Sequence, residues 1–480
     1  MNYRMISYIL GWILIFEGLF LSVPMLTAIV YGESVLPSYL IAMGICFLIG
    51  GLLVFKKPKK KQLFAREGCV IVALSWIVLS AFGALPFLMT REIPTFIDAL
   101  FETVSGFTTT GASILSDVEK LSHASLMWRS FTHWVGGMGV LVFIMAFIPL
   151  SGAQNMHIMK AESPGPSVSK LVPRVKTTAL ILYSIYFALT LIEFIMLLFG
   201  GMTVFEALTT SFATAGTGGF GFYNSSMGSF SPYLQIVITV FMILFAINFN
   251  CYYMLLCGKL REAFNLELRT FLIIIASVIT VITINIHGMF SSVEEALRHS
   301  AFTVASLIST TGFSTVDFNQ WPELSRALLV IIMFIGACAG STGGGMKVSR
   351  LCIMAKTVMK ELAFIIHPRN VRKTRFEGKT VEHEVLRSIN VFLVAYLGIF
   401  VLSVMLISLD NFDFATNFTA VAATLNNIGP GLAKVGPTQN FGIYSNFSKL
   451  VLAFDMLSGR LEIFPMLVPV IYLLRKKQLS

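Results

Sequence analysis

The chain has 480 residues, of which 56% are hydrophobic and only 12% are charged, and its formal net charge is +10. Its mean hydropathy of +0.79 excludes a water-soluble domain of this length, because so apolar a surface would aggregate in water. We therefore interpret the chain as a polytopic membrane protein. The positive charge does not indicate a nucleic-acid partner, since the basic residues fall between long apolar stretches.

Apolar stretches long enough to cross a bilayer recur along the whole chain. A helix needs about 20 apolar residues to span the hydrocarbon core, and about ten stretches approach that length. In chain order they are residues 6–30, 36–54, 70–89, 125–150, 178–198, 234–256, 271–286, 327–359, 389–409 and 450–474. The first has no small-residue cleavage site and a second apolar stretch follows it, so we expect a retained span and not a removed signal peptide.

Lysine and arginine gather in alternate loops. The basic segments are residues 56–66, 160–176, 259–269, 350–387 and 475–477, whereas the loops at 32–34, 116–122 and 410–412 carry far fewer basic residues. The positive-inside rule places the basic segments in the cytoplasm. It also predicts that both chain termini are cytoplasmic, which agrees with an even number of spans.

Four short segments on the opposite side of the membrane each end on a glycine, and each lies between two apolar stretches. The segments are Thr109, Thr110 and Gly111; Thr217, Gly218 and Gly219; Thr310, Thr311 and Gly312; and Asn427, Ile428 and Gly429. The stretch of about a dozen residues before each glycine is too short and too polar to span, so we expect a re-entrant half-helix, which is tolerated at membrane depth only where it is buried or lines a water-filled cavity.

The four segments agree in register. Two residues before each glycine stands a residue with a side-chain oxygen. Six residues before each glycine stands a small residue, as close packing of half-helices around one axis requires, and these residues are Ser105, Ala213, Ser306 and Ala423. Thirteen residues before the glycine, Asp98 and Glu206 are acidic in two of the four segments, which predicts an outer mouth that weakly attracts cations.

This pattern favours an ion-selectivity filter. A ring of backbone carbonyls can replace the water around a monovalent cation without a fixed charge that would hold the ion too tightly. Carbonyls point inward where the backbone adopts conformations that glycine tolerates, and half-helices aim their negative ends at the ion. Close packing of helices in lipid also enriches small residues. We assign that role to Gly136, Gly137 and Gly139, but packing does not explain a register shared by four segments.

A second glycine-rich run interrupts the apolar stretch at 327–359. It consists of Gly340, Ser341, Thr342, Gly343, Gly344 and Gly345. Each glycine costs about 1 kcal/mol of helix propensity, so we expect a loop inside the membrane. A nucleotide-binding loop is not expected, because Met346 follows the last glycine and Lys347 is not followed by Ser or Thr. We interpret Lys347 and Arg350 as markers of the cytoplasmic end of a helix.

Arg460 stands inside the last apolar stretch. A charge at mid-membrane is costly, so the side chain should face a pore or a partner and not lipid. Glu462 is two residues away and does not share its helix face. The alternative is a structural ion pair with Asp455 or another acidic neighbour.

The chain resembles the TrkH, KtrB and HKT superfamily of potassium transporters over essentially its whole length. The resemblance is carried by residues 107–113 (FTTTGAS), 134–139 (WVGGMG), 217–220 (TGGF), 309–314 (STTGFS) and 426–432 (NNIGPGL). Two additional N-terminal spans and the fourth segment resemble the bacterial TrkH branch most. This resemblance implies four membrane-pore-membrane repeats around one path, a homodimer in the bacterial cytoplasmic (inner) membrane, and regulation by a cytosolic nucleotide-binding ring of the TrkA type.

The resemblance also implies roles for individual residues. The loop at 340–345 would obstruct the pore until the cytosolic partner pulls on it, and Arg460 would lie beneath the filter and lower its cation occupancy. Plant members with serine at the first filter glycine prefer sodium, so Gly111 implies potassium. The chain departs from the repeated pattern at Gly218, where two other segments have threonine, and at Pro430 after the fourth glycine.

The expected architecture is an all-α polytopic membrane protein with about ten transmembrane helices. Residues 1–66 would hold two N-terminal helices and a basic loop. Pore repeats would follow at residues 67–160, 161–262, 263–362 and 363–480, the third with a broken second helix and the fourth after a basic cytoplasmic loop.

The expected function is potassium uptake through a gated, channel-like pore, with K⁺ as the transported ion and no bound cofactor. A proton- or sodium-coupled potassium symporter on the same scaffold is the alternative. An enzyme is not expected, because the chain has no H-E-x-x-H or G-x-S-x-G spacing. Residues 356–387 would contact either an acidic cytosolic partner or anionic lipid headgroups.

Overall fold

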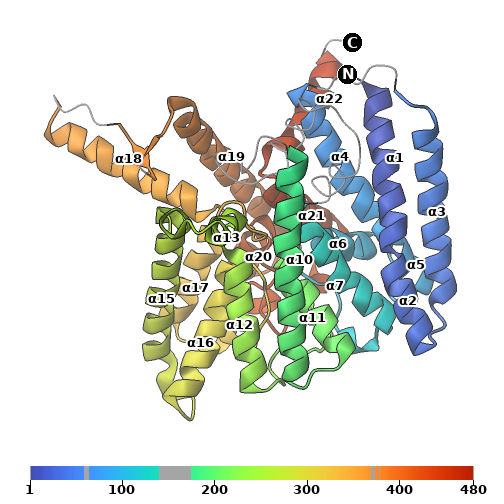
Figure 1. Ribbon diagram of the computed structural model, residues 1–480, viewed down its shortest axis with the longest axis horizontal. Coiled ribbons are helices and arrows are strands. Elements are labelled where there is room, and N and C mark those ends of the chain that lie inside the picture. Colours follow the sequence, from blue (N-terminus) through green and yellow to red (C-terminus); the bar gives the residue numbers. More distant parts are fainter. Residues whose placement is uncertain (1, 59–63, 140–174, 369–372, 378, 479–480) are drawn as a thin grey trace.

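The protein is a bundle of helices with one short antiparallel ribbon, as the computed structural model shows (Figure 1). Residues 2–58, 64–139, 175–368, 373–377 and 379–478 are described. The end of the fourth expected span at 140–150 and the basic residues at 59–61, 160–174 and 369–372 lie outside the described residues, as do the side chains of 475–477. The repeat boundary at 160/161 lies outside them as well.

Three helices precede the repeated part of the chain: α1 (Tyr3–Phe20), α2 (Ser22–Tyr31) and α3 (Leu36–Phe55). They stand at one edge of the molecule (Figure 1). Helix α1 packs along α3, and Gly11 and Gly50 meet where the two helices cross. A methyl group on either glycine would lie within 2.9 Å of the other's carbonyl oxygen, so the small residues permit the close approach.

Four times the chain then follows one order: a long helix, a shorter helix, a loop and a further helix. The first unit contains α4 (Ala65–Gly83), α5 (Leu85–Thr90), α6 (Phe96–Phe107), η1 (Val118–Lys120) and α7 (His123–Gly137). The second contains α10 (Val175–Phe199), α11 (Val204–Gly216), α12 (Pro232–Ala246), α13 (Phe249–Leu256) and α14 (Leu260–Ala263).

The third and fourth units carry the same order with additions. The third contains α15 (Leu266–Ile286), η2 (His287–Met289), α16 (Val293–Ile308), η3 (Phe318–Gln320), α17 (Glu323–Ile335), α18 (Val348–Ile366), β1 (Arg375–Phe376) and β2 (Lys379–Thr380). The fourth contains α19 (His383–Ile407), η4 (Ser408–Asp410), α20 (Phe414–Leu425), η5 (Ala433–Val435), η6 (Phe441–Ile443), α21 (Asn446–Arg460) and α22 (Phe464–Gln478).

By length and composition, six of the expected spans are helical segments able to cross a membrane. A seventh, α12 with α13, is bent by 90°. The remaining three are not continuous within the described residues. Helix α7 ends at Gly137, residues 336–347 separate α17 from α18, and residues 461–463 separate α21 from α22. The last break has a local cause, because Glu462 and Ile463 both have positive φ, which an α-helix does not accommodate.

The expected half-helices are present as α6, α11, α16 and α20, and each begins with a side-chain cap. Thr95, Thr203, Ser292 and Asp413 each accept a hydrogen bond from a first-turn amide, which satisfies backbone donors that a helix leaves free. Helix α16 is longer than the expected dozen residues, with 16.

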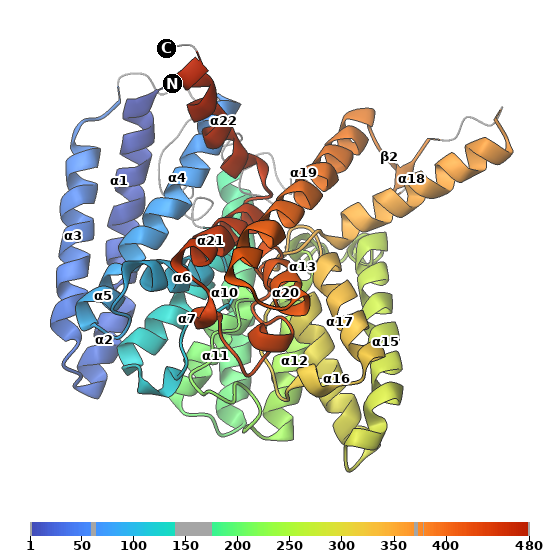
Figure 2. The ribbon, with the colours of Figure 1, turned by 180° about the vertical axis from the view of Figure 1, so that it is seen from behind.

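Helices α18 and α19 extend beyond the rest of the bundle and diverge from its axis (Figures 1 and 2). The β1–β2 ribbon connects them. They rise toward the face where α1 begins and α22 ends (Figure 2). The structure therefore places a projecting arm directly after the residues that interrupt the third unit.

Candidate functional site: a ring of four loop segments

The four Thr/Asn-x-Gly segments share one unusual backbone conformation. The residue two before each glycine is left-handed, with φ of 55° at Thr109, 55° at Thr217, 62° at Thr310 and 56° at Asn427. The glycines also have positive φ, 78° at Gly111, 75° at Gly219, 89° at Gly312 and 100° at Gly429. A β-branched residue rarely adopts this conformation, so its occurrence at three threonines indicates that the surrounding structure imposes it.

Each left-handed residue ends one half-helix in the same way. The amide that follows it donates to the carbonyl of the small residue six before the glycine, in the pattern of a Schellman cap. These bonds are Thr110 to Ser105 at 2.9 Å, Gly218 to Ala213 at 2.9 Å, Thr311 to Ser306 at 2.8 Å and Ile428 to Ala423 at 2.9 Å. All four small residues are fully buried, as the sequence predicted for close packing.

The four segments touch one another in a closed circle. A methyl group in place of each glycine's hydrogen would collide with the carbonyl oxygen of the middle residue in the next segment. The pairs are Gly111 with the oxygen of Gly218 at 2.0 Å, Gly219 with that of Thr311 at 2.0 Å, Gly312 with that of Ile428 at 2.1 Å, and Gly429 with that of Thr110 at 2.8 Å. The order therefore runs from the first segment to the fourth and back to the first.

The departure at Gly218 has a structural reason. His133 of α7 lies against this residue, and a Cβ built on Gly218 would be 2.2 Å from the imidazole Cγ. The imidazole of His133 accepts a hydrogen bond at Nε2 from the amide of Phe220 at 3.2 Å, and its Nδ1 lies 2.8 Å from the carbonyl oxygen of Gly106. His133 thus connects the first half-helix to the second segment, and the threonine found at this position in the first and third segments would not fit.

A buried ion pair supports the same two segments. Arg129 Nε lies 2.8 Å from Glu102 Oε1, and both side chains are almost fully buried. The guanidinium also donates to the carbonyl of Gly221 at 3.1 Å and lies 4.0 Å from the centre of the Phe220 ring. The sequence prediction did not include this pair, although charged residues inside apolar stretches are a signal that could have found them.

The three glycines near His133 in α7 divide into two roles. Gly136 and Gly137 allow close helix packing, as expected, because a Cβ on Gly136 would lie 1.9 Å from the carbonyl oxygen of Phe107 and one on Gly137 would lie 2.8 Å from Gly216 Cα. Their carbonyl oxygens additionally accept hydrogen bonds from Arg460. Gly139 has positive φ, 83°, just after α7 ends.

The glycine-rich loop between α17 and α18 lies against the third and fourth segments. The amide of Gly344 donates to the hydroxyl of Thr310 at 2.6 Å. A Cβ on Gly343 would lie 2.7 Å from the carbonyl oxygen of Ser309, and one on Gly344 would lie 2.4 Å from that of Asn426. The loop expected from the sequence is therefore present and touches the residues of the ring.

Arg460 reaches this loop from the end of α21. Its guanidinium donates to the carbonyl oxygens of Thr342 at 2.7 Å and Gly137 at 2.6 Å, and to that of Gly136. The sequence alternative of a pair with Asp455 is not what positions it, since Asp455 accepts from Ser403 at 2.7 Å. Arg460 instead links the loop to the first unit.

Lys347 and Arg350 stand at the N-terminal end of α18, as N-cap and in the first turn, so both lie at a helix end, and both are buried there. Lys347 is 2% exposed and its ammonium donates to the carbonyl of Gly343. Arg350 is 5% exposed and pairs with Glu462. The glycine-rich loop folds back onto the body, so the residues that follow it are covered by other helices, which the local sequence did not indicate.

The acidic residues expected at the outer mouth lie in the first turns of two half-helices. Asp98 lies in the first turn of α6, where it accepts from Thr95 at 2.5 Å and pairs with Lys449 at 2.6 Å. Glu206 accepts from the backbone amide of Thr203 at 2.9 Å in a capping box of α11. Their charges are engaged at half-helix N-termini, where a negative charge is stabilising.

Fold and site together define a membrane protein built from four units around a closed ring of four loop segments, a class suited to moving small ions. The TrkH family of cation transport proteins matches residues 36–479. The Trk system potassium uptake protein TrkH of Escherichia coli (strain K12) is 36% identical over 477 residues, and 98% of each chain is covered. The corresponding protein of Vibrio parahaemolyticus is 34% identical over 478 residues, again with 98% of each covered.

The fold agrees with a solved structure. The crystal structure of the potassium transporter TrkH from Vibrio parahaemolyticus superposes with a TM-score of 0.88 at 33% identity, and 98% of each chain is covered. The chain belongs to the TrkH family. This confirms the resemblance, the all-α polytopic fold and the expectation of a transport protein rather than an enzyme.

Proposed function

We propose that this protein takes up potassium across the bacterial cytoplasmic membrane through a channel-like pore whose selectivity filter is the ring of four segments. The printed names of the relatives, potassium uptake proteins of the Trk system, support the substrate. The observation that carries the proposal is the head-to-tail closure of the ring, in which each glycine of one segment faces a carbonyl oxygen of the next.

The filter would consist of the three residues of each segment, with K⁺ held by their carbonyl oxygens. Left-handed and positive φ values at the first and third residues turn successive carbonyls away from the helical direction, which is the geometry a carbonyl cage needs. The half-helices α6, α11, α16 and α20 end one or two residues before the first residue of each segment, so their negative ends support a cation.

The gate would be the loop of Gly340 to Gly345 together with Arg460. Support comes from the contact of Gly344 with Thr310 and from the hydrogen bond of Arg460 to Thr342. In this arrangement the loop closes the path beneath the ring. The positive charge of Arg460 lowers cation occupancy there, because like charges repel in a low-dielectric site.

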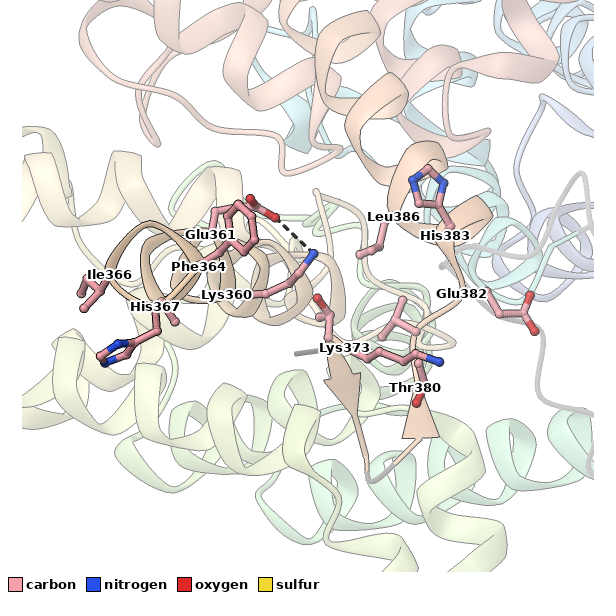
Figure 3. A pocket seen from close by; sticks show the side chains of 13 residues that line it. Lys360, Glu361, Phe364, Ile366, His367, Lys373, Thr380, Glu382, His383 and Leu386 are labelled. Carbon is pink, nitrogen blue, oxygen red and sulfur yellow. Dashed lines mark ion pairs between the residues drawn. The ribbon is translucent and has the colours of Figure 1, made fainter. Parts of the chain in front are cut away.

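The protein would work as a homodimer with a cytosolic nucleotide-binding ring of the TrkA type, and membrane lipid would cover its remaining apolar faces. The projecting arm of α18, the ribbon and α19 is an argument for a cytosolic docking surface. Between α18, the ribbon and the start of α19 lies a cavity of about 710 Å³ (Figure 3). Charged and apolar side chains both line it, among them Lys360, Glu361, Phe364, Lys373 and Leu386.

The topology in this proposal has both termini in the cytoplasm. The four units would correspond to pore repeats at residues 67–160, 161–262, 263–362 and 363–480, after the two N-terminal helices of 1–66. The start of α1, the end of α22 and the projecting arm share one face (Figure 2), and the described basic residues Lys360, Lys373 and Arg387 belong to that arm. This supports the proposed orientation, because basic residues favour the cytoplasmic side.

The test is a flux measurement on the purified chain in liposomes, with and without a bound cytosolic partner, for the native protein and for Gly111→Ser. We expect selective potassium flux that is degraded by the substitution, since a side chain there would meet the oxygen of Gly218. Flux indifferent to Gly111, or none with the partner present, would overturn the filter. Co-movement of protons or sodium with potassium would instead establish the coupled symporter.

A further inference from the structure

Glu267 is a buried carboxylate that belongs to none of the expected sites. It lies in the first turn of α15 and is 4% exposed. Its Oε1 accepts the amide of Ala339 at 2.7 Å and the amide of Ser349 at 3.1 Å. One oxygen of one side chain therefore binds two backbone donors that are ten residues apart in the chain.

The two donors stand on opposite sides of the glycine-rich run. Ala339 precedes Gly340, and Ser349 is the second residue of α18. The chain also closes on itself here, because the amide of Val348 donates to the carbonyl of Ala337 at 3.2 Å. Ala339 and Ser349 thus form the two sides of the neck of the loop, and Glu267 binds both of them to α15. Helix α15 is neither of the two helices, α17 and α18, that the loop connects.

The contact with Ser349 connects the loop to the projecting arm. Helix α18 has no side-chain cap of its own at its N-terminus, and the Glu267 carboxylate supplies an acceptor for one of its first amides. A negative charge at this position is stabilised by the helix dipole. A displacement of α18 along or away from its axis would pull the Ser349 amide off the carboxylate that also holds Ala339.

We propose that Glu267 is a positioning residue, a latch that holds the loop against the ring of segments and makes the position of the loop depend on the position of α18. This inference rests on the proposed gating role of the loop. While α18 keeps its position, the shared carboxylate holds both sides of the neck. When a partner moves the arm, loss of the Ser349 bond loosens the anchor of Ala339, so the loop leaves the ring of segments.

Other contacts hold the loop and α18 without Glu267, which makes the latch separable in an experiment. Arg460 holds Thr342, and Arg350 pairs with Glu462 in the break between α21 and α22. These contacts do not involve Glu267. A variant at Glu267 therefore frees the amides of Ala339 and Ser349, which flank the glycine-rich run, and a variant at Arg460 frees the carbonyl of Thr342 within it.

The experiment compares Glu267→Ala, Glu267→Gln and Arg460→Gln in the full chain, reconstituted in liposomes without a partner. Glu262→Ala is the matched control, because Glu262 lies nearby in α14, is exposed and pairs only loosely with Lys259 at 3.5 Å. Two readouts are taken: basal potassium flux, and the rate at which the buried thiol of Cys338 in the loop reacts with a maleimide. Cys46, buried in α3, is the internal reference for reactivity.

Loss of a buried acceptor leaves two amides without a partner, so Glu267→Ala should raise both basal flux and Cys338 labelling by about tenfold. Glu267→Gln keeps an acceptor oxygen and should fall between Glu267→Ala and the native chain. Cys46 labelling should not change, and an increase there would show general unfolding and overturn the latch.

The outcomes separate the latch from the gate. If Arg460→Gln raises basal flux while Glu267→Ala changes neither flux nor Cys338 labelling, the gate stands and the latch is overturned. If both variants expose Cys338 but neither alters flux, the loop does not gate the path and the proposed function fails at that point. If Glu267→Gln behaves like Glu267→Ala in both readouts, hydrogen bonding through the oxygen is not the cause and the latch is overturned.

Discussion

The imidazole of His133 occupies the space that a side chain at residue 218 would fill, with only 2.2 Å between its Cγ and a Cβ built on Gly218. Residue 218 is the middle position of its segment, and the other three segments carry Thr110, Thr311 and Ile428 there. The histidine replaces that side chain with a hydrogen bond from the amide of Phe220. The second segment is therefore held by His133 of the neighbouring helix α7 and not by a side chain at residue 218.

This relationship predicts a strong coupling between two substitutions. Gly218→Thr should abolish selective flux, because the added side chain overlaps the imidazole. Adding His133→Ala to it should recover part of the flux, since space is restored although the Phe220 bond is lost. Potassium and sodium flux in liposomes measures both. Thr311→Gly is the matched control at the equivalent position, and additive effects of the Gly218 and His133 changes would contradict the steric account.

The four glycines should differ in their tolerance of alanine. At Gly111, Gly219 and Gly312 a methyl group would lie 2.0 to 2.1 Å from a carbonyl oxygen, whereas at Gly429 the distance is 2.8 Å. Overpacking costs roughly 1 to 3 kcal/mol, so the first three alanine variants should lose about tenfold or more of their potassium flux, and Gly429→Ala should lose less.

A control for the glycine series separates collision from backbone strain. Gly201 has φ of 91° and no atom within 4 Å of a built Cβ. Gly201→Ala therefore imposes the same left-handed strain with no carbonyl nearby, and its flux should stay close to native. An equal loss at Gly201 and Gly111 would mean that strain, and not contact between segments, explains the need for glycine.

Removal of one partner of the Arg129–Glu102 pair should destabilise the protein strongly. A buried charge left alone costs about 3 to 5 kcal/mol, so Glu102→Gln or Arg129→Leu should lower the midpoint of thermal unfolding in detergent clearly. The double variant should lose less than the sum, because no unpaired charge remains. Glu262→Gln, which removes an exposed pair with Lys259 at 3.5 Å, should change the midpoint little.

The hydroxyl of Thr310 should hold the loop against the ring. Thr310→Val keeps the shape but leaves the amide of Gly344 without its acceptor, a loss of about 1 to 3 kcal/mol. Basal potassium flux without a partner should rise by about tenfold, while the preference for potassium over sodium is kept because the carbonyls remain.

The equivalent threonine of the first segment provides the comparison. The hydroxyl of Thr109 is buried and has no hydrogen-bond partner within the described part of the chain. Thr109→Val should therefore leave basal flux near the native value. A rise in basal flux equal to that of Thr310→Val would argue against a specific bond between the third segment and the loop.

Much of the fold and of the candidate ring was predictable because both depend on local pattern. Runs of apolar residues determine the spans. In every unit the pattern of Thr310 and Gly312, a side-chain oxygen two positions before a glycine, marks the end of a half-helix, and the structure shows the same cap at all four ends. The break at Gly340 to Gly345 was also predictable, since consecutive glycines disfavour a helix wherever they occur. Within the residues that the structure describes, three expected spans are interrupted: after Gly137, at residues 336–347 and at residues 461–463, where Glu462 and Ile463 have positive φ.

The sequence by itself thus determined the class of protein, its repeated order and the register of the four segments, since each follows from residues close together in the chain. Only the tertiary structure decided that Lys347 is buried, that Arg460 binds backbone carbonyls of two units, that His133 replaces a side chain at Gly218 and that Glu267 joins both sides of the loop. These contacts join residues far apart in sequence. They are set by how whole helices pack, and no short pattern in the chain encodes that arrangement.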